Sequence, residues 1–238
     1  MARLMTQARS GSKPMRRPDS SPAAPPLDLP QPKLRPGKSL SDSLQLRQTV
    51  REISDTPLPP QLLSNLLWAA WGVNRQKGPF GALGRTAASA SNSQEIDLFV
   101  ALENGAYLFD ADHHRLVPVV AGDVRAMAIS PGQGKRVSMK APVQLLYAVD
   151  MDRLIHTSGF QEPGLHDPEV QKSYYFVDTG LVAGNVYLFA ASQGLAAWFH
   201  NCDRAGLGKK LKLRSDQLVL FAQSVGYPAA ASTGAGPR

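Results

Sequence analysis

The sequence predicts an α+β fold in which helices and strands are interleaved irregularly around one sheet. Apolar residues recur at helical spacing over 61–71 and again over 168–193. Three other segments, 96–102, 143–149 and 217–225, are apolar runs of strand length. Because the order of these segments does not follow the regular strand–helix alternation of a doubly wound parallel sheet, we expect α+β rather than α/β.

The N-terminal part of the chain differs in composition from the rest. Residues 1–38 hold eight basic and two acidic side chains, so they carry +6 of the formal net charge of +7. They also contain eight of the 19 prolines and no aromatic residue. Such a segment buries too little apolar surface to offset the entropy of ordering it, so we expect a disordered leader.

We divide the 238 residues into this leader over 1–38, one domain over 39–228 and a flexible tail over 229–238. The nearly neutral domain argues against a nucleic-acid partner, and no apolar run approaches the ~20 residues of a membrane span. The basic start is not followed by the apolar stretch of a secretory signal. A cytoplasmic location is therefore expected, or a periplasmic one if the true start lies upstream.

The domain is expected to begin with a short amphipathic helix over 39–53. Ser41 can cap its N-terminus, and Leu44, Leu46 and Val50 give it an apolar side. A proline-rich break separates it from the next helix.

That next helix, 61–71, is strongly apolar and is expected to be buried. The glycine-rich segment 72–84 and the polar segment 86–95 are expected to be loops. The strand over 96–102 then turns through Glu103, Asn104 and Gly105 into a second strand over 106–109. A short helix is expected over 121–129, before the strand at 143–149.

The helix expected over 168–193 is unusually long and apolar. Its apolar positions keep helical spacing over several turns: Val170, Tyr174, Val177, Leu181 and Leu188. A second subunit is a natural way to bury such a helix, so we expect a homodimer.

Several chemistries lack the residues that they need. The chain has neither a dinucleotide-binding glycine motif nor a triphosphate-binding loop. Cys202 is the one cysteine, which excludes an intrachain disulfide and a thiolate metal cluster. His113 and His114 lie near Asp110 and Asp112, but adjacent side chains point apart, so we expect a polar hairpin tip and no metal site.

An arginine cluster near the start of the domain is more informative. Arg47 and Arg51 are four residues apart on the expected helix, with Thr49 between them. Like charges at this spacing repel, so an anion or a carboxylate is expected between them. Two guanidinium groups and a hydroxyl suit a phosphate.

This Arg-x-Thr-x-Arg pattern and the small-residue segment 88–94 together resemble the FMN-dependent nitroreductase family, and in particular its azoline-dehydrogenase-like subgroup. The blocks that carry the resemblance are 63–75, 85–97, 141–150, 178–195 and 216–228. The resemblance implies a nitroreductase-like fold, with a central mixed or antiparallel sheet flanked by helices. It also implies a homodimer with two FMN sites at the subunit interface, each built from both subunits.

The resemblance also implies an activity, an FMN-dependent NAD(P)H oxidoreductase. A reduced nicotinamide donates a hydride to FMN, which passes it to a small-molecule electron acceptor such as a nitroaromatic or a quinone. The flavin performs this chemistry, so no catalytic side chain is expected. The alternatives are a peptide-modifying azoline dehydrogenase and a flavin-binding protein without enzymatic activity. The azoline dehydrogenases use a Lys-Tyr pair near the start of the long helix. In this sequence Lys172 and Tyr174 do not match the positions of that pair.

The same resemblance assigns the cofactor-binding residues, which are Arg47, Gln48, Thr49, Arg51, Ala88, Ser89, Ala90, Asn92, Gln133, Arg136, Asn201 and Cys202. Arg47 and Thr49 match the phosphate and ribityl contacts, and Arg51 and Arg136 are the electrostatic support for the reduced flavin. The 88–92 loop comes from the other subunit, and Asn201-Cys202 approach the flavin N5 through backbone groups. Two departures are Ala88 in place of the family proline and a missing C-terminal cation. Lys209, Lys210 or Lys212 is expected to replace that cation.

Overall fold

The computed structural model describes residues 25–33, 37–130, 141–160 and 165–230. Its centre is a seven-stranded sheet in which every pair of neighbours is antiparallel. In spatial order the strands are β1 (Leu27–Asp28), β6 (Arg115–Ala121), β5 (Gly105–Asp110), β4 (Ile96–Leu102), β7 (Val143–Asp150), β9 (Gln217–Gly226) and β8 (Ala196–His200). The α+β class is therefore confirmed.

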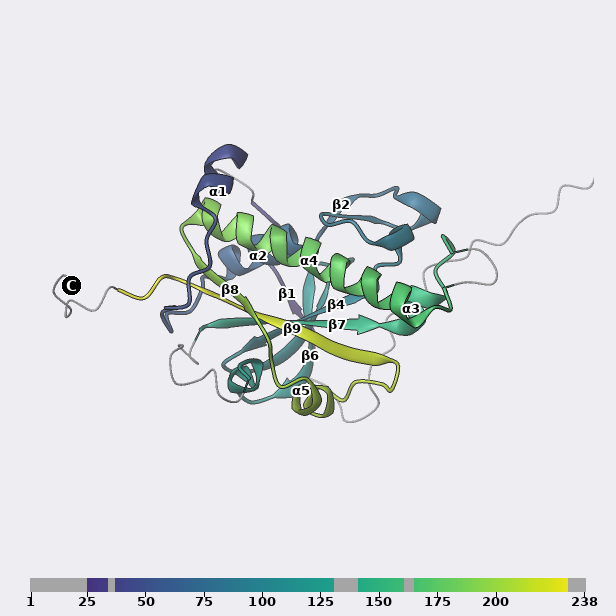
Figure 1. The fold of residues 1–238 in the computed structure, drawn as a ribbon. Coiled ribbons are helices and arrows are strands. Elements are labelled where there is room, and N and C mark those ends of the chain that lie inside the picture. Colours follow the sequence, from purple (N-terminus) through teal and green to yellow (C-terminus); the bar gives the residue numbers. More distant parts are fainter. Residues whose placement is uncertain (1–24, 34–36, 131–140, 161–164, 231–238) are drawn as a thin grey trace, which may run out of the picture.

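Helices cover both faces of this sheet (Figure 1). Helices α2 (Pro60–Trp71) and α4 (Pro168–Gln193) pack on one face, whereas α5 (Arg204–Lys210) and the 3₁₀ turn Arg125–Ala128 pack on the other. The remaining described elements are α1 (Leu40–Leu46), α3 (Met151–Ile155), the hairpin β2–β3 (Val73–Arg75, Gly84–Arg85) and the 3₁₀ turns Pro79–Gly81 and Ala90–Asn92.

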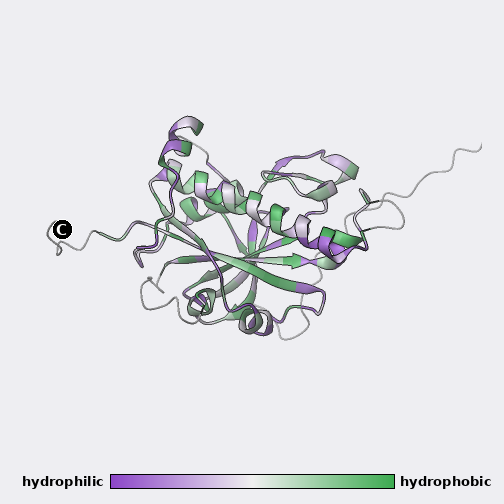
Figure 2. Cartoon of the chain, in the orientation of Figure 1, coloured by the Kyte–Doolittle hydropathy of each residue, from purple (hydrophilic) through white to green (hydrophobic). Residues whose placement is uncertain are grey.

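The central strands are buried on both sides. In β7, Leu145 and Tyr147 join the core with α2 and α4, and Leu146 and Ala148 join the core with α5. Side chains alternate between the faces of a strand, so a strand covered on both faces is a continuous apolar run. Figure 2 shows these strands largely in the hydrophobic colour. The strands predicted at 96–102, 143–149 and 217–225 are thus confirmed within one residue at each end.

Strands β6 and β8 were not predicted, and the helix predicted over 121–129 is wrong. The loop predicted over 72–84 is also wrong in part, because β2 and β3 pair there as a short hairpin. Residues 115–121 form β6, and only a 3₁₀ turn follows it. Strand β8 directly follows α4, whose end is set by Gly194. Gly194 takes a left-handed φ of 69°, and its N–H bonds back to the last turn, so the chain reverses within three residues.

The helix predicted over 39–53 is wrong in its length and its cap. It ends at Leu46 and is capped by Ser39 rather than Ser41, since Ser39 accepts a hydrogen bond from the Asp42 N–H. Its leucines at 40, 44 and 46 are exposed. The chain beyond Leu46 is extended because it forms hydrogen bonds to the edge of the sheet. The Val50 N–H donates to the Ala197 carbonyl, 3.0 Å away, and Ile53 forms a β-bridge with Pro228.

The leader is also not disordered throughout. Residues 27–28 form β1 on the edge of β6, and the Pro30 carbonyl accepts hydrogen bonds from Ser64 and His114. The Asn65 side chain bonds to the backbone of Lys33. The prediction of disorder is therefore wrong for residues 25–33, whose backbone carbonyls bond to side chains of α2 and whose Leu29 packs against the core.

Helix α4 has the predicted bounds but presents an unexpected face to the core. Its buried apolar residues are Val182, Ala183, Val186 and Ala190. The positions that predicted the helix point elsewhere: Val170, Val177 and Leu181 are 38%, 59% and 44% exposed. The helix therefore has one apolar side against the sheet and a second that no described residue covers.

Among the described residues, no helix is both long and apolar enough to cross a membrane.

The order in residues 25–33 predicts a difference between two truncations. Removal of 1–33 is expected to lower the free energy of unfolding by about 1–3 kcal/mol relative to removal of 1–24, because the bonds to Ser64, Asn65 and β6 are lost. Urea unfolding of both truncated proteins measures the difference. Identical unfolding curves would contradict it.

Candidate functional site

Three of the predicted site residues lie on the extended segment beside β8 that follows α1, and not on the helix expected from the sequence. Arg47 and Thr49 contact Tyr187 on α4, whereas Arg51 contacts Trp198 on β8. The guanidinium carbon of Arg47 lies 5.7 Å from the ring centre of Tyr187, and that of Arg51 lies 5.9 Å from the ring of Trp198.

Tyr187, on α4, holds this segment in place. Its hydroxyl lies 3.1 Å from Thr49 Oγ1 and accepts a hydrogen bond from the Phe199 N–H at 2.8 Å. A hydroxyl can accept one bond and donate another, so Tyr187 joins α4, β8 and the extended segment at one point. Sequence reasoning missed Tyr187. The one feature that could have indicated its role is a hydroxyl-bearing side chain on a helix face that otherwise consists of small and apolar residues.

The donor set of this segment is free to bind an anion. Arg47, Thr49 and Arg51 are exposed, and neither guanidinium forms an ion pair with a carboxylate of the described residues. Two planar cations and a hydroxyl are the donors that suit a phosphate. These residues therefore fit the phosphate end of FMN.

Gln48 lies next to this group. With Leu46, Val50 and Pro228 it lines a cavity of about 170 Å³. The wall of this cavity also includes Tyr187, the residue that Arg47 and Thr49 contact.

The second predicted part of the site is the loop over 88–94. Three of its residues, Ser91, Asn92 and Gln94, have left-handed φ values of 48°, 54° and 52°, which is a costly conformation for residues other than glycine. Side-chain bonds maintain it: Ser89 Oγ accepts from the Gln94 N–H at 3.0 Å, and Asn92 Oδ1 accepts from the Gln94 amide at 3.0 Å.

Neighbouring elements hold this loop from outside. Arg85 Nε donates to Gln94 Oε1 at 2.7 Å, and Asn92 Nδ2 donates to the Pro79 carbonyl at 3.2 Å. Gly159 packs directly against it, since a Cβ there would lie 2.2 Å from Ser91 Cβ. Ala88 is exposed, so the place of the family proline is at the surface of the loop.

A buried carboxyl pair lies under the loop, and sequence reasoning missed it. Asp178 Oδ2, on α4, accepts from the Ala90 N–H at 2.7 Å, and Glu95 Oε2 accepts from Ser93 Oγ at 2.6 Å. Burial, followed by the charge of Asp178, raises the pKa of Glu95 to about 8. Burial also raises the pKa of Asp178.

The two parts of the site attach to α4 at different points. The arginine segment meets it at Tyr187 and the loop meets it at Asp178, nine residues earlier. At 1.5 Å per residue this is a separation of about 13 Å along the helix axis. Within one chain, the arginine segment and the loop are therefore held at separate points of α4.

Asn201 and Cys202 follow β8. The Asn201 carbonyl accepts from His200 Nδ1 at 2.9 Å, and its side chain accepts from Arg204 at 3.2 Å. Cys202 is buried in the core that α5 covers, and burial raises the pKa of its thiol to about 11. Its side chain is thus a core residue, and only its backbone is available for a ligand. Gln133 and Arg136 lie outside the described residues.

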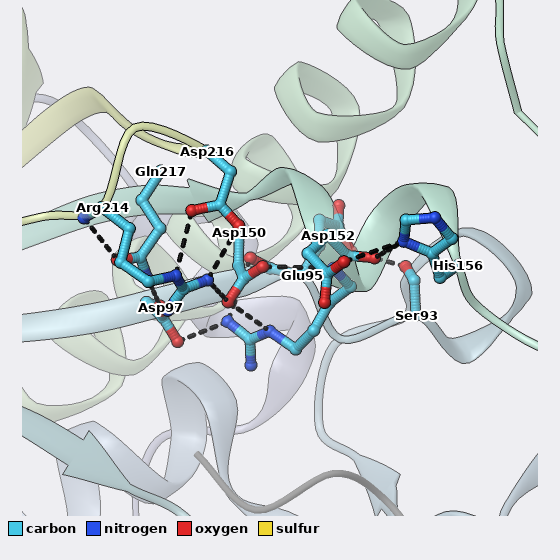
Figure 3. A network of polar contacts seen from close by, with 10 residues as sticks. Ser93, Glu95, Asp97, Asp150, Asp152, His156, Arg214, Asp216 and Gln217 are labelled. Carbon is cyan, nitrogen blue, oxygen red and sulfur yellow. Dashed lines mark hydrogen bonds and ion pairs between the residues drawn. The ribbon is translucent and has the colours of Figure 1, made fainter. Parts of the chain in front are cut away.

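Charges at the end of β4 and β7 are paired with one another (Figure 3). Arg214 bonds to Asp150 at 2.8 Å and to Asp216 at 3.0 Å, and Arg153 pairs with Asp97. Despite burial, the bonds to Asp216 and Asp150 raise the pKa of Arg214. These groups satisfy one another, so this network is structural.

The two histidines lie at the tip of the β5–β6 hairpin. His113 Nδ1 lies 2.9 Å from Asp110, and His114 Nε2 lies 2.7 Å from Ser64 Oγ, so the two rings have different partners. No group of three or more metal-ligating side chains occurs among the described residues. Lys209 and Lys210 end α5, which packs on the sheet face opposite α4, so the structure does not place them near the arginine segment.

Replacement of Tyr187 by Phe is expected to lower the free energy of unfolding by about 1–3 kcal/mol. The change leaves the Phe199 N–H without an acceptor and the Thr49 hydroxyl without a partner. Urea unfolding measures the loss. Tyr174→Phe is the matched control, since among the described residues Tyr174 has a ring contact with Phe160 and no hydroxyl bond. Equal losses in the two variants would contradict the role of Tyr187.

Comparison with known proteins identifies relatives of the chain by sequence and by fold. A protein of Methanocaldococcus jannaschii named as a nitroreductase homologue is 29% identical over 163 residues, which cover 66% of this chain and 75% of that protein. A crystal structure of a nitroreductase homologue from Ralstonia eutropha is 33% identical, with a TM-score of 0.76, and covers 92% of this chain and 97% of that chain.

More distant structures share the fold alone. The NADPH:FMN oxidoreductase of Vibrio harveyi, in complex with NAD+, is 17% identical with a TM-score of 0.56, covering 84% of this chain and 72% of that chain. The microcin synthetase McbBCD complex of E. coli gives 16% identity and a TM-score of 0.61, covering 91% and 78%. The model of the nitroreductase family itself matches residues 44–227, which is most of the domain, and the chain therefore belongs to the nitroreductase family.

Proposed function

We propose that the protein is an FMN-dependent NAD(P)H oxidoreductase that passes a hydride to a small acceptor such as a nitroaromatic or a quinone. The observation that carries the proposal is the exposed donor set of Arg47, Thr49 and Arg51 on one extended segment, in which neither guanidinium is paired with a carboxylate of the described residues. Family membership and the fold shared with an NADPH:FMN oxidoreductase support it. A cytoplasmic location stays a prediction.

The residues of this chain have distinct tasks in the proposed site. When bound, FMN supplies the group that accepts and returns the hydride. Arg47 and Thr49 bind its phosphate, and Arg51 faces the pyrimidine edge of the ring, where a fixed cation stabilises negative charge. Arg136 has the same electrostatic task in the proposal and lies outside the described residues. The backbone of Asn201 and Cys202 orients the ring.

The 88–92 loop completes the site from the partner subunit of a homodimer. Within one chain this loop attaches to α4 about 13 Å along the helix from the arginine segment, and in the proposed dimer the partner's copy of the loop lies at that segment instead. The uncovered apolar side of α4, with Val177 and Leu181, is the surface on which the two copies pack.

Replacement of Arg47 by Ala is expected to weaken FMN binding at least about tenfold, because a charge-assisted bond to phosphate contributes about 1.5–3 kcal/mol. Titration of the apoprotein with FMN, followed by flavin fluorescence, measures the affinity. Arg115→Ala is the control, since Arg115 pairs with Asp110 at the opposite edge of the sheet. Protein that releases no flavin on heating and binds none in the titration would overturn the proposal.

Replacement of Leu181 by Asp is expected to convert the homodimer to a monomer and to remove flavin binding with it. A carboxylate at the centre of a packed apolar surface stays uncompensated. Sedimentation equilibrium measures the mass. Leu218→Asp, at a residue that is 48% exposed on β9, is the matched control. A wild-type monomer that binds FMN fully would refute both the dimer and the shared site.

A further inference from the structure

We propose that Glu95 and Asp178 are positioning residues of the flavin site, which share one proton beneath the 88–94 loop and thereby hold its backbone. The inference rests on the proposed function, in which this loop contacts the cofactor. Three observations support it: the two carboxyl groups are buried, each accepts a hydrogen bond from the loop, and no cation of the described residues is paired with either of them.

The two carboxyl groups are buried near each other. Glu95 is 0% exposed and Asp178 is 4% exposed. Glu95 uses Oε2 to accept from Ser93, whereas Oε1 is buried with no hydrogen-bond partner among the described residues, and the neighbouring Asp178 carboxyl raises the pKa of Glu95. A proton on Glu95 Oε1 donates to Asp178, and the pair then carries one negative charge instead of two.

The charged groups around the pair do not neutralise it. From α3, Arg153 approaches Glu95, but its guanidinium donates to the main-chain carbonyl of Glu95 and pairs with Asp97 and Asp150. From α4, Asp178 is the group that faces Glu95, and from the loop only the hydroxyl of Ser93 does so. The acids at this end of the sheet therefore fall into two kinds, those neutralised by arginine and those neutralised by a proton.

The pair acts on the loop through both of its ends. Asp178 holds the Ala90 N–H at the start of the left-handed stretch, and Glu95 holds the Ser93 hydroxyl at its end. Between these points lie Ser91 and Asn92, whose φ values persist only if the surroundings fix them. When Glu95 loses its proton to solvent, both carboxylates still accept from Ala90 and Ser93, but they repel each other and so displace the two ends of the loop that they hold.

The sign of the pH dependence follows. In the folded protein the pKa of Glu95 is about 8, and in the unfolded chain it has its usual value near 4.5. Between these two pH values the folded state therefore binds more protons than the unfolded state. The contribution of Glu95 to stability therefore falls as the pH rises from 5 to 8 and is level above that. Flavin affinity depends on the folded-state proton alone, so it falls only as the pH passes about 8.

The test compares the wild-type protein with Glu95→Gln. The amide is a permanent mimic of the protonated acid, because its N–H donates to Asp178 and its oxygen accepts from Ser93. We expect the wild-type affinity for FMN to be up to about tenfold weaker at pH 9 than at pH 7, one unit above the titration, and that of Glu95→Gln to change less than about twofold. Glu95→Ala is expected to bind FMN weakly at both values, and Glu103→Gln, at an exposed turn, is expected to follow the wild type.

The outcomes separate the two proposals. FMN binding with the same pH dependence in the wild type and in Glu95→Gln would overturn the positioning role and leave the proposed function standing. Absence of FMN binding in the wild type at every pH would overturn the proposed function and this inference with it. Thermal unfolding from pH 5 to 8 gives a second readout, in which Glu95→Gln is expected to lose part of the downward slope of the wild type. An unchanged slope would also overturn the shared proton.

Discussion

The hydroxyl of Tyr187 and the carboxyl of Asp178 fasten two distant segments of chain to α4, and the length of helix between them sets the geometry of the whole site region. Tyr187 binds the extended arginine segment and β8, and Asp178 binds the small-residue loop. The helix itself is fixed by the residues that it buries against the sheet, so both segments inherit its position. The opposite side of α4 is apolar and is not covered by any described residue. The proposed site therefore depends on the proposed dimer, in which a second copy covers this side.

Both edges of the sheet are closed by chain that precedes the first long helix. β1 pairs with β6 at one edge, and the segment from Val50 to Ser54 bonds to Ala197 and Tyr227 at the other. An open edge strand is a template for wrong pairing, so these short segments protect the sheet. At the second edge the protection has another consequence. The segment that bonds to this edge also carries Arg47, Thr49 and Arg51, and its extended conformation leaves all three exposed.

The negative charges of the buried acids at one end of the sheet are compensated in two ways. Asp97 and Asp150 meet Arg153 and Arg214, whose charges compensate them at any ordinary pH. Glu95 and Asp178 have no such cation, and a proton takes its place. The first arrangement suits a permanent junction between strands, and the second makes the loop above it responsive to pH.

The sequence by itself determined the class, the long strands, α4 and the family, because covered strands and a long apolar helix leave strong local patterns. It also identified Arg47, Thr49 and Arg51 as a group, although by the wrong geometry. Only the tertiary structure decided that they lie on an extended chain, since that depends on hydrogen bonds to β8. The order in residues 25–33 and the contact of Glu95 with Asp178 likewise arise between segments far apart in the chain, where no local pattern records them.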